Sequence, residues 1–269
     1  PRADPQGRRH PGMSDFGATA PRMKTAIITD LHANREALEA VLDHARSQQV
    51  QAWALLGDFV GYGADPGWVL DRVRELVDQG AVAVQGNHDL ATVEGPSPEM
   101  RPEPRLVIGW TRSQLDDEQV EFLARLPMRH ETAEVLYVHA NAWAPQQWGY
   151  ILGRFDAVRS LHATRSHVTF CGHVHEPRLY HLSSIGKAGD FVPTPGVPIP
   201  LLAQRQWLVL PGSVGQPRDG DPAASYAVHD RAAGTLTYWR VPYDHDTAAA
   251  KIRAAGLPAA LGDRLAHGV

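Results

Sequence analysis

Short apolar runs alternate with longer segments of mixed polarity along the first part of the chain. The apolar runs cover residues 24–29, 52–56 and 81–85. After the first run, apolar residues recur at helical spacing, which predicts an amphipathic helix capped by Asn34. After the second run, Asp65 and Pro66 predict the start of another helix, and Gly80 predicts its end. Strands that alternate with helices favour an α/β fold with a parallel sheet and right-handed crossovers.

The pattern changes in the second half of the chain. Alternating apolar residues from about Gln206 onward predict antiparallel strands, which we expect to complete a second sheet. Residues 244–269 are expected to form helices that cover this second sheet, and the proline-containing stretch 185–200 is expected to be an irregular surface excursion. Residues 1–22 have no periodicity, so we expect a flexible N-terminal tail followed by a single domain, residues 23–269.

Polar residues gather where the predicted strands end. They are Asp30 and His32, then Asp58, then Asn87, His88 and Asp89, then His139, and finally His173 and His175. The carboxyl ends of parallel strands lie at one edge of a sheet, so these side chains are expected to lie close together. Members of a pair two residues apart in an extended chain point to the same face. Mixed carboxylate and imidazole ligands suit manganese, iron, zinc, nickel or cobalt better than calcium.

Each of these motifs also has an ordinary structural interpretation. Asp30 can cap a helix, the sequence "GNHD" can form an Asx turn, and "GHVH" can be a solvated turn. Five such placements at five successive strand ends favour a metal site over coincidence. Cys171 is treated differently, because it lies inside an apolar run where a free cysteine behaves as a small hydrophobic residue.

The order of these motifs, D-x-H, G-D, G-N-H-D, a lone His and G-H-x-H, resembles the calcineurin-like metallophosphoesterase superfamily. The stretches "TDLHAN", "GDFVGYGADP" and "PGSVGQPRDGDPAASYAV" resemble its bacterial and archaeal branch of small phosphodiesterases and dinucleoside polyphosphate hydrolases. The resemblance implies a four-layer α/β/β/α sandwich of two mixed sheets flanked by helices. Ala33 departs from the pattern, because many relatives have glycine there, and the protein phosphatase signature D-R-G is replaced by "GDFVGYG".

The resemblance also implies roles for individual residues. It places one metal ion on Asp30, His32, Asp58 and His175, and a second ion on Asp58, Asn87, His139 and His173. It makes His88 the catalytic imidazole and Asp89 the residue that orients it.

The chemistry expected of such a site is hydrolysis of a phosphodiester, phosphoanhydride or phosphomonoester by a metal-bridged hydroxide, with His88 protonating the leaving group. Two divalent ions are expected, manganese first, and the substrates include nucleotides and dinucleoside polyphosphates. Arg218 and Tyr62 are candidate substrate contacts, and the aromatic residues Trp143, Trp148 and Tyr150 are candidates for stacking on a base. Ordinary alternatives are core packing for the aromatic residues and pairing of Arg218 with Asp219 or Asp221.

Composition narrows the possible partners. The net charge of −4, without a block of like charge, argues against an extended nucleic-acid track. The single cysteine excludes an intramolecular disulfide and a thiolate zinc site within one chain, which suits a cytoplasmic protein. No apolar stretch is long enough to predict a membrane span. The alternatives that remain open are a nonhydrolytic metal-dependent binding or scaffold protein on the same fold and a metal-dependent nuclease.

Overall fold

The computed structural model describes residues 23–96 and 98–269, so the predicted N-terminal tail, residues 1–22, lies outside the described residues. Its first sheet has six strands in the order β3-β2-β1-β11-β12-β9. Their bounds are β1 Lys24–Ile28, β2 Ala52–Leu55, β3 Val82–Ala83, β9 Ile199–Pro200, β11 Ala224–Asp230 and β12 Thr235–Val241. The sheet is mixed, because β1 pairs in parallel with β2 and antiparallel with β11.

The second sheet also has six strands, in the order β4-β5-β6-β10-β7-β8. Their bounds are β4 Arg129–Glu131, β5 Val135–Val138, β6 Val168–Phe170, β7 Pro177–Ser183, β8 Ala188–Phe191 and β10 Arg205–Pro211. Strand β6 pairs in parallel with both β5 and β10, and β10 pairs antiparallel with β7. This sheet is therefore mixed as well.

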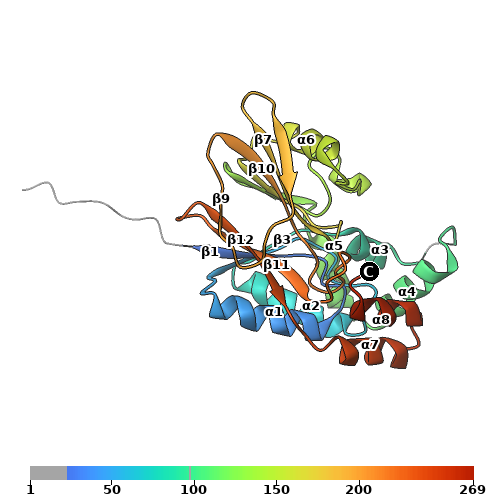
Figure 1. The fold of residues 1–269 in the computed structure, drawn as a ribbon. Coiled ribbons are helices and arrows are strands. Elements are labelled where there is room, and N and C mark those ends of the chain that lie inside the picture. The colour runs from blue at the N-terminus through green and yellow to red at the C-terminus, as the bar shows by residue number, and fades with distance from the viewer. Residues whose placement is uncertain (1–22, 97) are drawn as a thin grey trace, which may run out of the picture.

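Helices cover the outer faces of the two sheets (Figure 1). The helices are α1 Arg35–Ser47, α2 Pro66–Asp78, α3 Asn87–Glu94, α4 Pro102–Ser113, α5 Asp117–Arg125, α6 Arg154–His162, α7 His245–Ala254 and α8 Ala259–Asp263, with short 3-10 turns at Pro145–Gln147 and Arg264–Ala266. Helices α1 and α2 lie on the first sheet, and α6 packs on β7, β8 and β10 of the second. The predicted four-layer α/β/β/α sandwich is confirmed.

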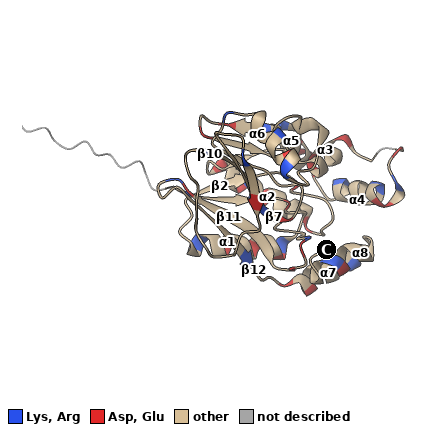
Figure 2. Ribbon diagram, turned by 45° about the horizontal axis from the view of Figure 1, so that its top comes forward, with Lys and Arg blue, Asp and Glu red and all other residues tan. Residues whose placement is uncertain are grey.

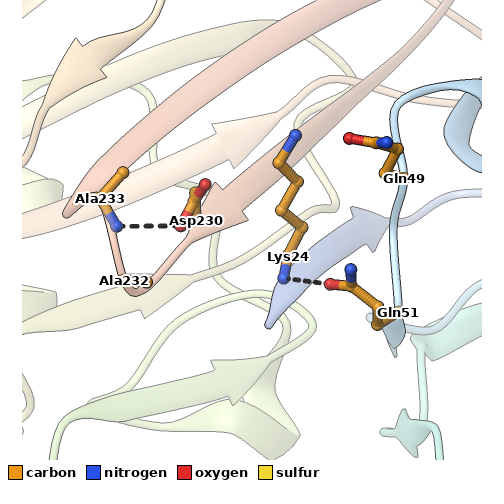
Figure 3. Close-up of a pocket in the computed structure, with 6 residues that line it drawn as sticks. All are labelled: Lys24, Gln49, Gln51, Asp230, Ala232 and Ala233. Atoms are coloured by element: carbon orange, nitrogen blue, oxygen red, sulfur yellow. Dashed lines mark hydrogen bonds between the residues drawn. The ribbon is translucent and has the colours of Figure 1, made fainter. Parts of the chain in front are cut away.

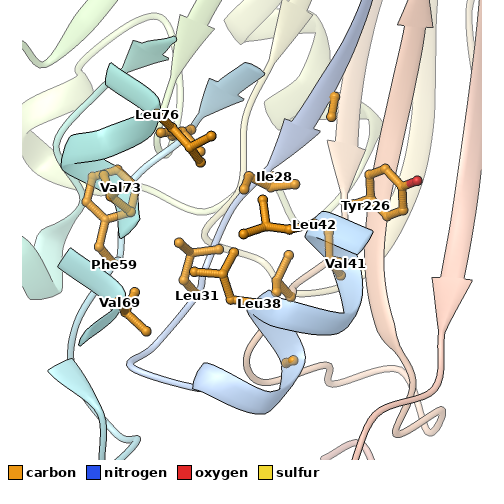
Figure 4. Close-up of a cluster of buried hydrophobic side chains, with 14 of the residues drawn as sticks. Ile28, Leu31, Leu38, Val41, Leu42, Phe59, Val69, Val73, Leu76 and Tyr226 are labelled. Carbon is orange, nitrogen blue, oxygen red and sulfur yellow. The ribbon is translucent and has the colours of Figure 1, made fainter. Parts of the chain in front are cut away.

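Period-2 alternation in the strands builds the separate apolar layers. On β1, Ile28 faces helices α1 and α2 in the cluster of Figure 4, whereas Ile27 packs between the two sheets. Both side chains are fully buried, and burial of one such side chain contributes about 1.5–3 kcal/mol to folding. The helix starts follow the sequence as well, since the Asn34 side chain accepts a hydrogen bond from the Ala37 N–H at 3.1 Å.

Two expectations about the second half of the chain are wrong. Only β10 of the late strands joins the second sheet, because β11 pairs with β1 in the first sheet and β12 pairs with β11. The C-terminal helix α7 contacts α1 and shares an apolar cluster with Val107 of α4, so it covers the first-sheet side of the molecule. The register of β11 on β1, with Ala227 opposite Ile27, decides this placement through long-range pairing.

Two further segments differ from expectation. The stretch 185–200 is not an irregular excursion, because it supplies β8 to the edge of the second sheet and β9 to the edge of the first. The apolar run 81–85 forms only the two-residue strand β3. None of the helices in the described part of the chain has the length and apolar character that a bilayer crossing requires.

Candidate metal centre

The polar residues predicted at the strand ends meet at one edge of the two sheets. Asp30 and His32 follow β1, Asp58 follows β2, Asn87 and His88 begin α3, His139 follows β5, and His173 and His175 follow β6. Two groups of acidic and histidine side chains bring their ligand atoms within 4.8 Å of one another: Asp30, His32, Asp58 and His175 in the first, and Asp58, His139 and His173 in the second. Asp58 belongs to both groups, and we call these six residues together with Asn87 the metal centre.

Distances within the first group are short. His175 Nε2 lies 3.2 Å from Asp30 Oδ1 and 3.2 Å from His32 Nε2. Asp58 Oδ2 lies 3.8 Å from His32 Nε2. All four side chains are at most 3% exposed, so their polar atoms face a small volume shielded from solvent.

The second group is equally tight. His139 Nε2 lies 3.3 Å from Asp58 Oδ2, 3.2 Å from His173 Nδ1 and 3.2 Å from the amide oxygen of Asn87. Asn87 is thereby placed with the carboxylate and the imidazoles, as predicted from the "GNHD" motif. Asp58 links the two groups, because its Oδ2 atom faces imidazoles of both.

Backbone carbonyls orient all four imidazoles. In each ring, the nitrogen turned away from the metal centre donates a hydrogen bond to a main-chain carbonyl. His32 donates to Val60 O at 3.3 Å and His139 to Leu56 O at 2.6 Å. His173 donates to Trp148 O at 2.9 Å and His175 to Gln216 O at 2.7 Å. Each inward-facing nitrogen of a neutral ring is then an acceptor. Acceptors 3.2 Å apart, beside two carboxylates, repel one another unless cations or protons lie between them. The donor set therefore fits divalent cations.

Backbone strain is concentrated at the same residues. Five members of the metal centre have left-handed backbone angles: φ is 53° at Asp30, 46° at His32, 52° at Asp58, 67° at His173 and 66° at His175. Non-glycine residues rarely adopt these angles, and such strain clusters at functional sites. Ala33 adopts φ 52° as well, at the position where many relatives of the resembling family have glycine.

Two glycines allow the strand ends to approach one another. A Cβ at Gly86 would lie 2.2 Å from Asp58 Oδ1, and a Cβ at Gly172 would lie 2.0 Å from the Thr29 hydroxyl. The Thr29 hydroxyl in turn donates to Asp30 Oδ2 at 2.9 Å. Any side chain at these two positions would displace a carboxylate of the metal centre.

Burial and the charges of neighbouring side chains have opposite effects on the pKa values of the residues in the metal centre. Burial raises the pKa of the Asp58 carboxyl, but the neighbouring His139, His88 and His32 together outweigh this effect and hold the pKa well below its usual range. Burial lowers the pKa of His139, but the Asp58 carboxylate raises it to about 9. The centre therefore favours positive charge close to Asp58, in the form of either a proton or a metal cation.

His88 lies at the entrance to the metal centre. Its backbone N–H donates to Asp58 Oδ1 at 2.8 Å, and its ring centroid lies 5.0 Å from that of His32 and 4.4 Å from that of Tyr62. Gly61 leaves room for this ring, because a Cβ there would lie 2.6 Å from His88 Nδ1. Burial lowers the pKa of His88, and the Asp58 carboxylate opposes this effect.

Asp89 has a different position from the one predicted. Its carboxylate accepts backbone N–H groups of Asp58, Phe59 and Gly86 at 2.9, 2.8 and 2.9 Å. No hydrogen bond joins it to the His88 imidazole in the described part of the chain, so an orienting role toward that ring finds no contact here. Burial and the Asp58 charge raise the pKa of Asp89 to about 7. Asp89 instead ties the loop after β2 to the turn that begins α3.

The candidate substrate contacts lie beside His88. The Arg218 guanidinium carbon lies 5.9 Å from the centroid of the Tyr62 ring, and Tyr62 packs against His32 with 4.6 Å between centroids. The alternative pairing of Arg218 with Asp219 or Asp221 is wrong, because both carboxylates pair with Arg240. Arg218 donates to the Gln216 side chain at 2.9 Å.

A separate pocket lies at the opposite ends of the strands. It has a volume of about 500 Å³ and is lined by Lys24, Gln49, Gln51, Asp230, Ala232 and Ala233 (Figure 3). Its carboxylate, Asp230, accepts the Ala233 N–H of its own turn, and the Lys24 N–H is bound by Gln51. Figure 2 shows acidic and basic residues interspersed along the helices of the described part of the chain.

Sequence reasoning missed the groups that hold the imidazoles in place. They are main-chain carbonyls of Leu56, Val60, Trp148 and Gln216, and every residue carries a carbonyl, so no side-chain pattern marks them. The Thr29 hydroxyl was also missed, although a polar residue that ends an apolar strand is a readable signal.

Comparisons with known proteins agree with this geometry. Residues 23–234 match the family model described as "Calcineurin-like phosphoesterase superfamily domain". An uncharacterized protein of Methanocaldococcus jannaschii is 34% identical over 246 residues, which cover 89% of this chain and 96% of the relative. The crystal structure of a metallophosphoesterase from Sphaerobacter thermophilus is similar with a TM-score of 0.82 and 36% identity, over 92% of this chain and 100% of that one. A hypothetical protein from Pyrococcus horikoshii shares the fold, with a TM-score of 0.74 and 17% identity over 92% of this chain and 99% of that one.

Proposed function

Since the chain belongs to the calcineurin-like phosphoesterase superfamily, we propose that it is a dinuclear metal-dependent phosphoesterase of small phosphate esters. The observation that carries the proposal is the pair of acceptor groups joined by Asp58, whose ligand atoms lie within 4.8 Å in each group. One cation would be held by Asp30, His32, Asp58 and His175, and the other by Asp58, Asn87, His139 and His173. Residues 23–269 would form one domain around this site.

The metal ions are proposed as divalent transition metals, manganese first. Imidazole nitrogen and carboxylate oxygen in one site suit manganese, iron, zinc, nickel and cobalt. When bound, two such cations attract the anionic phosphate and lower the pKa of a water molecule beside it. The protein contributes ligands that are already oriented, because carbonyls hold the four rings and strained backbone holds five of the ligand residues.

His88 is proposed as the acid that protonates the departing oxygen of the ester. Its ring lies beside the metal centre, in contact with the rings of both His32 and Tyr62, and its backbone N–H donates to Asp58. Burial lowers the pKa of the ring, whereas the negative charge of a bound phosphate would favour its protonated form. General acid catalysis of this kind contributes about a hundredfold to ten-thousandfold when the leaving group is poor.

Arg218 and Tyr62 are proposed as the residues that bind the phosphate group. The guanidinium carbon lies 5.9 Å from the centroid of the Tyr62 ring, and Arg218 has no carboxylate partner among the described residues. A free guanidinium next to a dinuclear site can bind two oxygens of a phosphate. Tyr62 packs on both His32 and His88, so its position links the phosphate site to the proposed acid.

The experiment compares manganese-dependent hydrolysis of bis(p-nitrophenyl) phosphate and p-nitrophenyl phosphate by wild type and Asp58→Asn. We expect activity in wild type and none in the variant, because Asp58 contributes to both ligand groups. Wild-type preference for the diester would identify a phosphodiesterase. Absence of turnover with manganese, iron, zinc, nickel and cobalt would overturn the enzyme proposal in favour of a metal-dependent binding protein.

A second comparison isolates His88. Replacement by alanine should slow hydrolysis of alkyl or nucleoside esters far more than that of nitrophenyl esters, whose leaving group needs little protonation. Equal losses for both kinds of ester would remove His88 from the role of acid.

A further inference from the structure

Tyr150 stacks on one of the proposed metal ligands and leaves much of its ring in solvent. Its ring centroid lies 4.1 Å from that of His173, with an angle of 19° between the planes. The side chain is nevertheless 46% exposed. Since the imidazole covers one face of the ring, the exposed area belongs to the other face and the ring edge.

Hydrogen bonds from two side chains hold the loop that carries Tyr150. His173 Nε2–H donates to the Trp148 carbonyl at 2.9 Å, and the Asn141 side chain donates to the Gly149 carbonyl at 2.8 Å. Gly149 also packs closely on Trp143, since a Cβ there would lie 3.2 Å from that indole. The orientation of Tyr150 is therefore set by the same contacts that orient His173, before any ligand binds.

We propose that the exposed face of Tyr150 is a stacking platform for the nucleobase of a nucleotide ester, which the metal centre hydrolyses. The inference rests on the proposed function and names the substrate class of that site. A flat aromatic face with an open side suits a planar ring, and base stacking on such a face is tolerant of base identity.

The position of the platform relative to the reacting phosphate supports this assignment. His173 Nδ1, on the ring beneath Tyr150, lies 3.2 Å from His139 Nε2 in the second ligand group. A base on the outer face of Tyr150 would thus lie one aromatic ring away from His173, whose Nδ1 faces the metal centre. The phosphate of the same nucleotide, joined to the base through one pentose, could then reach past the edge of the Tyr150 ring to the centre.

The proposed phosphate contacts lie beside the other ligand group. Tyr150 packs on His173 of the second group, whereas Tyr62 packs on His32 of the first group and lies near the Arg218 guanidinium. A nucleotide ester presents both features that these residues would bind, a planar base and an anionic phosphate.

A purely structural role for Tyr150, as a cover for His173, makes a different prediction. A cover would affect every substrate equally, because it acts only through the position of the imidazole. A platform would affect only substrates that carry a base. Two diesters with the same nitrophenyl leaving group separate these roles: the p-nitrophenyl ester of thymidine 5′-phosphate and methyl p-nitrophenyl phosphate.

The experiment measures KM and kcat for both diesters in wild type, Tyr150→Ala, Tyr150→Phe and Ile185→Ala. We expect Tyr150→Ala to raise the ratio of the nucleoside-ester KM to the methyl-ester KM by about fivefold to a hundredfold. Tyr150→Phe should restore the wild-type ratio. Ile185→Ala is the matched control, because Ile185 is 76% exposed in the turn after β7, at the end of that strand remote from His175.

A binding measurement tests the platform without turnover. Equilibrium dialysis with thymidine and adenosine, which carry no phosphate, should show binding to wild type and Tyr150→Phe and its loss in Tyr150→Ala. An unchanged KM ratio, or nucleoside binding that survives in Tyr150→Ala, would overturn the platform while leaving the phosphoesterase proposal intact. If wild type hydrolyses neither these diesters nor p-nitrophenyl phosphate with any of the five metals, the phosphoesterase proposal fails, and nucleoside binding still decides for or against the platform.

Discussion

Gly61→Ala offers a way to displace the proposed acid without touching a metal ligand. Gly61 has φ 87°, and a Cβ at this position would lie 2.6 Å from His88 Nδ1. An ordinary contact of about 3.4 Å requires the imidazole to move by about 0.8 Å. The ring belongs to a side chain that can rotate, so we expect it to move while the backbone of the loop is retained.

The expected losses follow from this displacement. A misplacement of about 1 Å can reduce catalysis by about a hundredfold, so kcat for an alkyl ester should fall by up to about a hundredfold. Nitrophenyl esters should lose much less, because their leaving group departs without protonation. Alanine at φ 87° should also lower the free energy of unfolding by about 1–2 kcal/mol.

Gly80→Ala is a control that introduces alanine at a positive φ without a steric clash against a side chain. Gly80 has φ 98°, and no atom lies within 4 Å of a Cβ placed there. The assay measures kcat for methyl phosphate and for p-nitrophenyl phosphate, together with denaturant unfolding and bound metal, in both variants. We expect similar unfolding free energies and unchanged metal content, with loss of kcat in Gly61→Ala alone. Equal loss on both esters, or equal loss in both variants, would refute the reasoning.

Three other substitutions test different parts of the structure. Asp58→Asn should reduce the metal retained after dialysis and abolish turnover, because the Asp58 carboxylate faces both ligand groups. If elemental analysis finds two ions per chain in the variant and its turnover rate equals that of wild type, the bridging role is disproved. Asp89→Asn should lower the free energy of unfolding by about 1–3 kcal/mol, because the amide NH₂ would face backbone N–H donors that bind a carboxylate oxygen in wild type. A variant as stable as wild type in urea unfolding would contradict this expectation. Burial lowers the pKa of His229 to about 4 from 6.5, so below pH 6.5 the unfolded chain takes up a proton that the folded chain does not. As the pH is lowered from 6.5 to 4, this residue should therefore reduce the free energy of unfolding of wild type by up to about 3 kcal/mol. His229→Leu should lose less stability over the same pH range in urea titrations. If the stability of both proteins depends on pH in the same way, His229 is excluded as the cause.

Local patterns in the sequence determined much of this protein. The spacing of apolar residues predicted helices α1 and α2, and the caps at Asn34 and Asp65–Pro66 predicted where they begin. Motif order predicted which side chains would meet at the strand ends, because parallel strands place their carboxyl ends at one edge. These features depend on neighbours within a few residues or on a rule that holds for every parallel sheet. They can therefore be predicted from a single amino-acid sequence.

Only the tertiary structure decided features that depend on distant pairing. The strands β11 and β12 carry the same alternation as β10. No local feature indicates that β11 pairs with β1 in the first sheet while β10 pairs with β6 in the second. The same holds for Asp89, whose carboxylate binds N–H groups thirty-one and thirty residues earlier in the chain at Asp58 and Phe59. Main-chain carbonyls orient the imidazoles, and the stacking of Tyr150 on His173 joins two loops. Backbone groups carry no residue-specific signal and side-chain alternation is common to all strands, so these contacts exist only once the two sheets have packed together.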